Sequence, residues 1–213
     1  MDDLYWAASG PKKNAAGTSP DKLDSQLSFN SSPNIDVFSN KIYFYEEVDK
    51  NTIYKLNKAI RELNYKLVAT DPERYLNPNS EHDHIELYIH SYGGSVLSAF
   101  AALDVIANNK IPIWTYVEGG AASAGTILSV VGKKRFISKR SYMLIHQLSS
   151  THWGKLEELR DSMQNSENLM KTIRDIYKEY AHVPSHELDE ILKHDLWLDS
   201  KKCLEWGLVD EII

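Results

Sequence analysis

Short apolar runs alternate with longer periodic segments along the chain. Runs rich in aromatic and β-branched residues predict strands at 41–45, 85–89, 111–117, 135–138, 142–145 and 208–213. Between several of these runs, apolar residues recur every three or four positions, which is the spacing of one face of a helix. Strands that alternate with helices in this way indicate an α/β domain with a largely parallel sheet.

The helical spacing is clearest in three segments. The first follows the strand at 41–45 and places on one face Ile53, Leu56, Ile60 and Leu63. The second carries the apolar stripe Val96, Ala99, Phe100, Leu103, Ile106 and Ala107. The third, from about 155 to 180, has near one face Leu156, Leu159, Met163, Leu169, Ile173, Ile176 and Tyr180. Two short helices are expected later in the chain, the first capped by Ser185 and the second by Asp199 or Ser200.

Two stretches lack periodicity. Residues 1–36 are rich in Ser, Asn, Lys, Asp, Gly and Pro, so we expect a mobile arm or a removable leader ahead of a domain spanning 37–213. Residues 1–6 of the chain are acidic and lack the basic and apolar segments of a signal peptide. Residues 70–83 contain two X-Pro pairs and predict a polar loop.

Composition narrows the class of protein. The chain has 213 residues, and its hydrophobic content of 42% suffices for a sizeable core. The formal net charge of −6 argues against nucleic acid or an anionic membrane as the main partner. Cys203 is the one cysteine, which excludes an intrachain disulfide and is compatible with a reducing compartment. No apolar run approaches membrane-spanning length, and we expect a cytoplasmic protein.

The most distinctive segment is Gly-Gly-Ala-Ala-Ser-Ala-Gly at 119–125, which is followed by an apolar run to Val131. Ser123 lies among residues without bulk, at the first turn of an expected buried helix. Free N–H groups and the positive end of the dipole at a helix start suit a serine nucleophile and an oxyanion site. A tight helix–sheet crossing that tolerates only small residues is the structural alternative.

A serine nucleophile needs a base and an orienting acid. His146 ends an apolar strand beside a loop, which favours projection toward a site, although a buried hydrogen-bonded histidine would give the same pattern. Asp195 follows a helix and precedes Leu196 and Trp197. A carboxylate buried there would need a partner, and an imidazole N–H would supply one. A surface aspartate at a helix end is the alternative.

Gly93 and Gly94 follow one strand and open a helix. Backbone N–H groups at such a turn can bind an anion or a developing oxyanion. The surrounding sequence matches neither the dinucleotide-binding nor the P-loop pattern. The N–H groups of Gly94 and Ala124 form a plausible oxyanion pair. His82 and His84 could touch a metal, but without further ligands at a recognised spacing we expect no metal site.

Together these segments resemble the Clp protease proteolytic subunit family (ClpP). The resemblance rests on residues 87–95, 120–125, 142–147 and 195–210, in that order and with compatible gaps, and covers about 37–213. It implies an α/β ClpP/crotonase-like fold with parallel sheet layers and a protruding helical handle at about 155–180. It also implies serine endopeptidase activity.

The resemblance assigns roles to individual residues. Ser123 falls on the nucleophile, His146 on the base and Asp195 on the acid of the triad. Gly94 and Ala124 fall on the oxyanion hole. Residues around the scissile bond would lie against Gly93, Ser95 and a strand containing Thr151, His152 and Trp153.

The family also implies partners. Its members form heptameric rings, stacked in pairs, and are fed by a hexameric AAA+ ATPase that uses ATP. This chain would therefore need no cofactor and would bind peptides or unfolded proteins. A cytoplasmic location is expected, or the plastid stroma or a host cytoplasm for a plastid or viral form.

Several positions depart from the family pattern. Tyr92 replaces the usual Pro, Leu148-Ser149-Ser150 replaces Pro-x-Gly, and His194 stands where Arg is common. Asn108 and Glu118 fall in the expected ATPase-docking pocket, and neither is apolar. Two other functions fit the same sequence: a non-catalytic ring subunit, and a crotonase-like acyl-CoA enzyme with similar oxyanion geometry.

Overall fold

The computed structural model describes residues 5–7, 35–70 and 84–213. An eight-stranded sheet forms its centre, with β10-β7-β6-β4-β3-β2 in order and β8 and β9 continuing from the end of β6. All neighbouring pairs in this sheet are parallel except β2–β3 and β8–β9. The strands are β2 (Asp36–Phe38), β3 (Lys41–Phe44), β4 (Ile85–Ser91), β6 (Ile113–Ala122), β7 (Lys134–Ile137), β8 (Tyr142–Leu144), β9 (Leu198–Asp199) and β10 (Glu211–Ile212).

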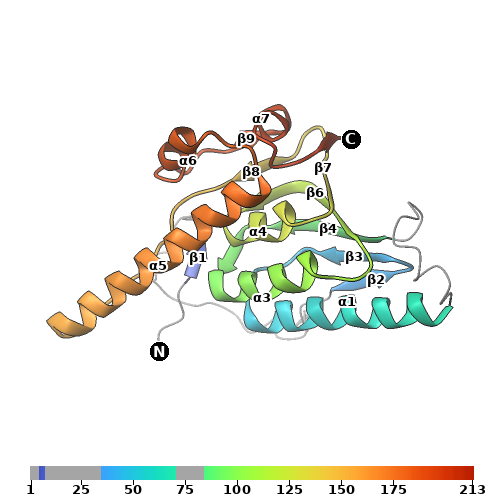
Figure 1. Ribbon diagram of the computed structural model, residues 1–213, viewed down its shortest axis with the longest axis horizontal. Helices are drawn as coiled ribbons and strands as arrows, with labels where there is room; N and C mark the ends of the chain where they lie inside the picture. The colour runs from blue at the N-terminus through green and yellow to red at the C-terminus, as the bar shows by residue number, and fades with distance from the viewer. Residues whose placement is uncertain (1–4, 8–34, 71–83) are drawn as a thin grey trace, which may run out of the picture.

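Helices cover one face of the sheet, as Figure 1 shows. α1 and α3 lie side by side, and α4 packs between α3 and β6. α5 crosses diagonally over α4, while α6 and α7 lie near the C-terminus. The bounds are α1 (Lys50–Thr70), α3 (Val96–Ala107), α4 (Ala124–Val130), α5 (Leu156–Tyr180), α6 (Ser185–Ile191) and α7 (Ser200–Glu205).

The core lies between this helical layer and the sheet. Alternate residues of β3 and β4, such as Ile42 and Leu87, are fully buried. The predicted stripe of α1 is buried at every position: Ile53, Leu56, Ile60 and Leu63. Burial of these apolar side chains supplies most of the driving force for folding. Cys203 is also buried, and burial raises the pKa of its thiol to about 12.

The other face of the sheet carries a row of half-buried aromatic side chains. Tyr43, Tyr88, Tyr116 and Phe136 come from four adjacent strands, and their ring centroids are 4.9, 4.7 and 4.7 Å apart in that order. In parallel strands, residues at matched register point to the same face, which aligns the rings. The alternation of apolar and aromatic positions therefore divides the sheet into a covered face and an aromatic face.

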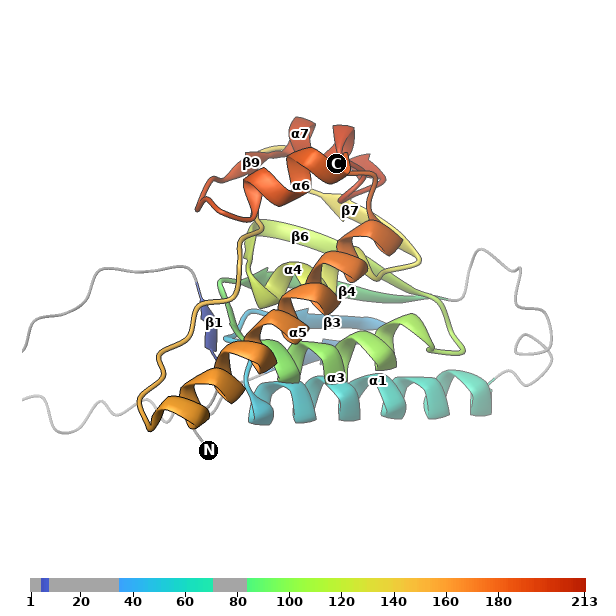
Figure 2. The ribbon, with the colours of Figure 1, turned by 60° about the vertical axis from the view of Figure 1, so that its left-hand side comes forward.

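α5 forms the protruding helix that the sequence predicts. Its C-terminal half is anchored by Ile173, Ile176 and Tyr177, which are buried. Its N-terminal half extends away from the sheet (Figure 2) and leaves Leu156 and Met163 more than 60% exposed. The apolar face predicted for residues 155–180 is therefore continuous in sequence, but only its second half packs within this chain.

Some boundaries differ from the prediction. The strand expected at 111–117 continues to Ala122, because the small residues that follow pair with both β4 and β8. α6 is preceded by Pro184 as its cap residue, so Ser185 is not the cap, whereas Asp199 caps α7 through a bond from the Lys202 N–H. Two strands were not predicted within 1–36: β1 (Tyr5–Ala7), and β2, which begins at Asp36.

The remainder of the predicted arm and the loop at 71–83 lie outside the described residues, and the division at residue 37 stays a prediction. Within the described residues, every helix is too short or too polar to cross a membrane.

Candidate active site

Ser123 lies at the junction of β6 and α4, in an unusual backbone conformation. Its φ of 56° and ψ of −129° place it outside the helical and extended regions. Among the described non-glycine residues only Ser39 also has a positive φ. Such a conformation costs about 1–3 kcal/mol and persists only where surrounding contacts enforce it. It turns the chain sharply from strand into helix at Ser123.

Hydrogen bonds on both sides enforce this turn. The Ser123 N–H donates to the carbonyl of Leu144 at the end of β8, at 2.8 Å. The hydroxyl of Thr126 donates to the Ser123 carbonyl at 2.6 Å and also contacts the hydroxyl of Tyr177 at 2.6 Å. Tyr177 is fully buried on α5. The backbone of Ser123 is thus fixed between β8 and the anchored end of α5.

The same pairing places the segment that leads into His146 beside the backbone of Ser123. β8 runs parallel to the end of β6, with Leu144 opposite Ala122, so the residues after both strands leave the sheet together. Beyond them, the Gln147 N–H donates to the carbonyl of Leu192 at 2.6 Å, which ties the His146 segment to the end of α6. Asp195 follows Leu192 by three residues, so this bond also holds the Asp195 segment near His146.

Asp195 contacts the imidazole of His146. Its Oδ1 lies 2.9 Å from His146 Nδ1. The imidazole side chain is only 6% exposed, whereas the carboxylate is 51% exposed. Burial lowers the pKa of His146, and the charge and hydrogen bond of Asp195 oppose this effect without reversing it. His146 is therefore neutral near pH 7, the state in which an imidazole can accept a proton.

Of the two glycines of β5 (Gly93–Ser95), Gly93 lies directly against Ser123 and Gly94 lies against Val48. A Cβ added at Gly93 would come within 2.6 Å of the Ser123 Cβ, and Gly93 has a φ of +100°. A Cβ at Gly94, whose φ is +142°, would come within 2.3 Å of the Val48 carbonyl oxygen. Both positions therefore require glycine for space and for conformation. Ala124 is the first residue of α4, so its N–H has no partner within that helix.

The remaining predicted substrate contacts divide into two groups. Ser95 caps α3 and accepts a bond from the Ser98 N–H at 3.3 Å, next to Gly94. Thr151, His152 and Trp153 are exposed in an irregular segment before α5, and Trp153 is 97% exposed. The strand expected there is absent from the described residues 145–155, because this segment forms no ladder with β8 or β5. A role in substrate binding stays a prediction.

Sequence analysis missed two backbone features at the site. One is Val48, which holds β5 from one side: its N–H donates to the Gly93 carbonyl at 2.8 Å, and its carbonyl accepts from the Ser95 N–H at 2.7 Å. The other is β1, which pairs with β5. The aromatic Tyr5-Trp6 pair within a polar arm was the available signal for β1.

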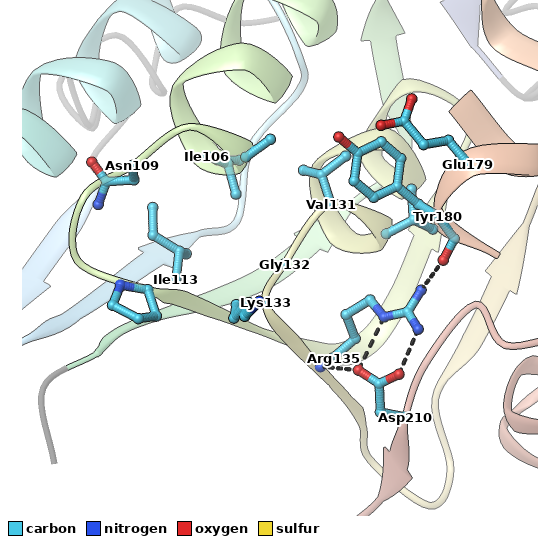
Figure 3. A pocket seen from close by; sticks show the side chains of 13 residues that line it. Ile106, Asn109, Ile113, Val131, Gly132, Lys133, Arg135, Glu179, Tyr180 and Asp210 are labelled. Atoms are coloured by element: carbon cyan, nitrogen blue, oxygen red, sulfur yellow. Dashed lines mark hydrogen bonds and ion pairs between the residues drawn. The ribbon is translucent and has the colours of Figure 1, made fainter. Parts of the chain in front are cut away.

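A hollow of about 530 Å³ lies elsewhere, and none of the predicted site residues lines it. Figure 3 shows its wall, where Arg135 donates three hydrogen bonds to the carboxylate of Asp210, one from its backbone N–H and two from its guanidinium, and also donates to the carbonyl of Tyr180. Burial alone would raise the pKa of Asp210, but the hydrogen bonds and charge of Arg135 outweigh it and lower that pKa. This ion pair connects β7 to α5 and to the C-terminal segment.

The possible metal ligands do not form a cluster in the described part of the chain, where no three His, Cys, Asp or Glu side chains gather. His84 stacks on Trp114, with ring centroids 3.6 Å apart. His82 lies outside the described residues.

Three comparisons place the chain among known proteins. The Clp protease family model matches residues 39–213. A protein of Deinococcus radiodurans named ATP-dependent Clp protease proteolytic subunit is 30% identical over 139 residues, which cover 64% of this chain and 67% of that protein. A solved structure of a ClpP1 mutant from Listeria monocytogenes has a TM-score of 0.69 at 20% identity, covering 82% of this chain and 91% of that one. This likeness confirms the predicted α/β fold, and the family match over 39–213 shows that the chain belongs to the Clp protease family.

Proposed function

We propose that this chain is a serine endopeptidase in which Ser123 is the nucleophile, His146 the base and Asp195 the orienting acid. The observation that carries the proposal is the 2.9 Å contact between His146 Nδ1 and Asp195 Oδ1. Because Nδ1 contacts Asp195, we assign proton transfer to Nε2, the other ring nitrogen. The Clp protease family match supports the same reaction class.

In the proposed mechanism, His146 Nε2 accepts the proton of the Ser123 hydroxyl as the oxygen attacks a peptide carbonyl. The resulting oxyanion lies against the N–H groups of Gly94 and Ala124. His146 then donates its proton to the leaving amine, and the peptide amine departs. A water deprotonated by His146 hydrolyses the acyl-enzyme and regenerates Ser123. Asp195 holds the imidazole tautomer and stabilises the imidazolium during both steps.

The assembly is also a proposal. The exposed apolar side chains of α5, which include Leu156, Leu159 and Met163, provide a surface for a second copy of the chain. We propose stacked heptameric rings that enclose the sites, with a separate hexameric AAA+ partner that uses ATP. The Deinococcus relative is named as ATP-dependent. The chain itself would need no cofactor, and the proposed location is the cytoplasm, or the plastid stroma or a host cytoplasm.

A pair of serine variants tests the reaction. Ser123→Ala removes the proposed nucleophile, whereas Ser129→Ala removes a buried hydroxyl of the same helix whose oxygen has no partner among the described residues. Hydrolysis of a fluorogenic peptide should fall to background in Ser123→Ala and remain near wild type in Ser129→Ala. Unchanged turnover in Ser123→Ala would contradict the proposal.

A further inference from the structure

Strand β5 offers two backbone edges, and they have different partners. Val48 occupies one edge through the carbonyl of Gly93 and the N–H of Ser95. Successive residues of a strand direct their N–H and C=O groups to opposite edges. The N–H and C=O of Gly94 therefore face away from Val48. This second edge contains the N–H group that we assign to oxyanion binding.

β1 lies along that second edge. It runs antiparallel to β5, with Tyr5 opposite Ser95, Trp6 opposite Gly94 and Ala7 opposite Gly93. An extended backbone from the start of the same chain thus faces the groups of Gly94. Figure 1 shows β1 as an isolated short arrow, apart from the large sheet.

This position coincides with the place that a peptide substrate would need. A peptide whose carbonyl reaches the Gly94 N–H beside Ser123 must run along the same edge of β5, because Gly93 lies directly against Ser123. Peptides commonly bind by adding a strand to an exposed sheet edge. One edge cannot pair with β1 and with a substrate at the same time.

We propose that β1 is an internal competitor that occupies the substrate-binding edge of β5 and limits peptide binding until it is displaced. This inference rests on the proposed peptidase function. A tethered segment can act at an effective concentration near the millimolar range. It therefore competes with peptides of moderate affinity, raising KM and leaving kcat unchanged.

A proline variant in the full-length protein tests the competition. Trp6→Pro removes the N–H at the centre of β1 and fixes φ, which disfavours pairing with Gly94. Ala15→Pro makes a similar change in the polar arm outside β1 and serves as the control. The measurements are hydrogen–deuterium exchange of the segment 92–95 and the KM and kcat for a short fluorogenic peptide.

We expect Trp6→Pro to speed exchange at Gly94 and to lower KM several-fold at constant kcat, while Ala15→Pro matches the wild type. A synthetic peptide of residues 1–10 should then inhibit Trp6→Pro competitively, and a scrambled peptide should not. Unchanged exchange, or faster exchange with unchanged KM, in an active enzyme would overturn the competition. Absence of turnover in every variant would instead overturn the proposed function, and the competition with it.

Discussion

Asp195 and His146 form a hydrogen bond between one well-solvated group and one buried group. The two atoms are 2.9 Å apart, yet the carboxylate is half exposed and the imidazole almost fully buried. Solvent screens the charge of an exposed carboxylate, so burial determines the direction of the His146 pKa shift. Asp195 is thus better placed to orient the imidazole than to increase its basicity.

The pH profile of peptide hydrolysis should reflect this balance. The proposed mechanism requires neutral His146, so kcat/KM should be constant at neutral pH and fall as pH decreases through the His146 pKa. Because burial lowers that pKa, the midpoint should lie below the ordinary histidine value of about 6.5. Initial rates measured from pH 4.5 to 8 test this, and a midpoint at or above the ordinary value of about 6.5 would contradict it.

Asp195→Asn should lower kcat and should also move the acid midpoint of the pH profile to lower pH. It removes the interaction that raises the pKa of His146, so the acid midpoint should move to lower pH. Loss of the orienting carboxylate should lower kcat by about 10⁴-fold. The control is Asp189→Asn, which removes an exposed carboxylate that contacts Arg174 and should change neither value. A large rate loss without a shift of the midpoint would indicate a merely structural role.

Gly94→Ala should abolish most activity by displacing the proposed oxyanion donor. The added Cβ would lie 2.3 Å from the Val48 carbonyl oxygen at a φ that alanine rarely adopts, so β5 must move. Losing one oxyanion donor costs about 10²–10³ in rate. Gly154→Ala is the control, because its Cβ would meet the flexible end of the Glu158 side chain. Circular dichroism should show that both variants fold, and wild-type kcat in Gly94→Ala would remove Gly94 from the mechanism.

Arg135→Met should destabilise the fold more than an exposed arginine variant. The Arg135 side chain is buried and forms an ion pair with Asp210. It also donates a hydrogen bond to the Gly207 carbonyl at 2.8 Å. Breaking a buried pair costs about 3–5 kcal/mol, and we expect the lower end because Asp210 is half exposed. Arg174→Met breaks an exposed pair and should cost less than about 1 kcal/mol. Denaturant titrations measure both, and equal costs would contradict the assigned role of Arg135.

In the proposed double-ring assembly, the exposed half of α5 should form the contact between rings. Met163→Lys introduces a charge on the 62% exposed apolar surface of α5 and should split a double ring into single rings. Leu204→Lys makes a similar change at an exposed site on α7 and serves as the control. Analytical ultracentrifugation separates the two species. An unchanged assembly in Met163→Lys would place the contact elsewhere.

The elements with strong local signals were predictable from sequence. The α1 stripe and the alternating β4 positions fix which side chains enter the core, independent of distant contacts. The approach of the segments containing Ser123 and His146 follows from parallel strands that end at the same edge of a sheet, and the register of Ala122 with Leu144 is consistent with it. The catalytic roles of these residues stay predictions.

Long-range backbone contacts were not predictable in the same way. Two such contacts reach Gly94: its pairing with Trp6 and its bridge with Val48. Both join backbone groups that are far apart in the sequence, and every residue carries these groups, so the amino-acid sequence holds no pattern that predicts them. The irregular course of Thr151–Trp153 has a similar origin. Its aromatic and β-branched residues favour a strand, but no strand in the part of the chain that the structure describes pairs with them.

A native mass spectrum with a fluorophosphonate probe tests the central claim most directly. We predict a ring-sized assembly in which each chain gains one probe mass, with labelling lost in Ser123→Ala and retained in Ser129→Ala. A ring that never reacts would identify a non-catalytic subunit. Labelling that persists in Ser123→Ala, or a small species without labelling, would contradict the account of Ser123 as the nucleophile of a compartmentalised peptidase.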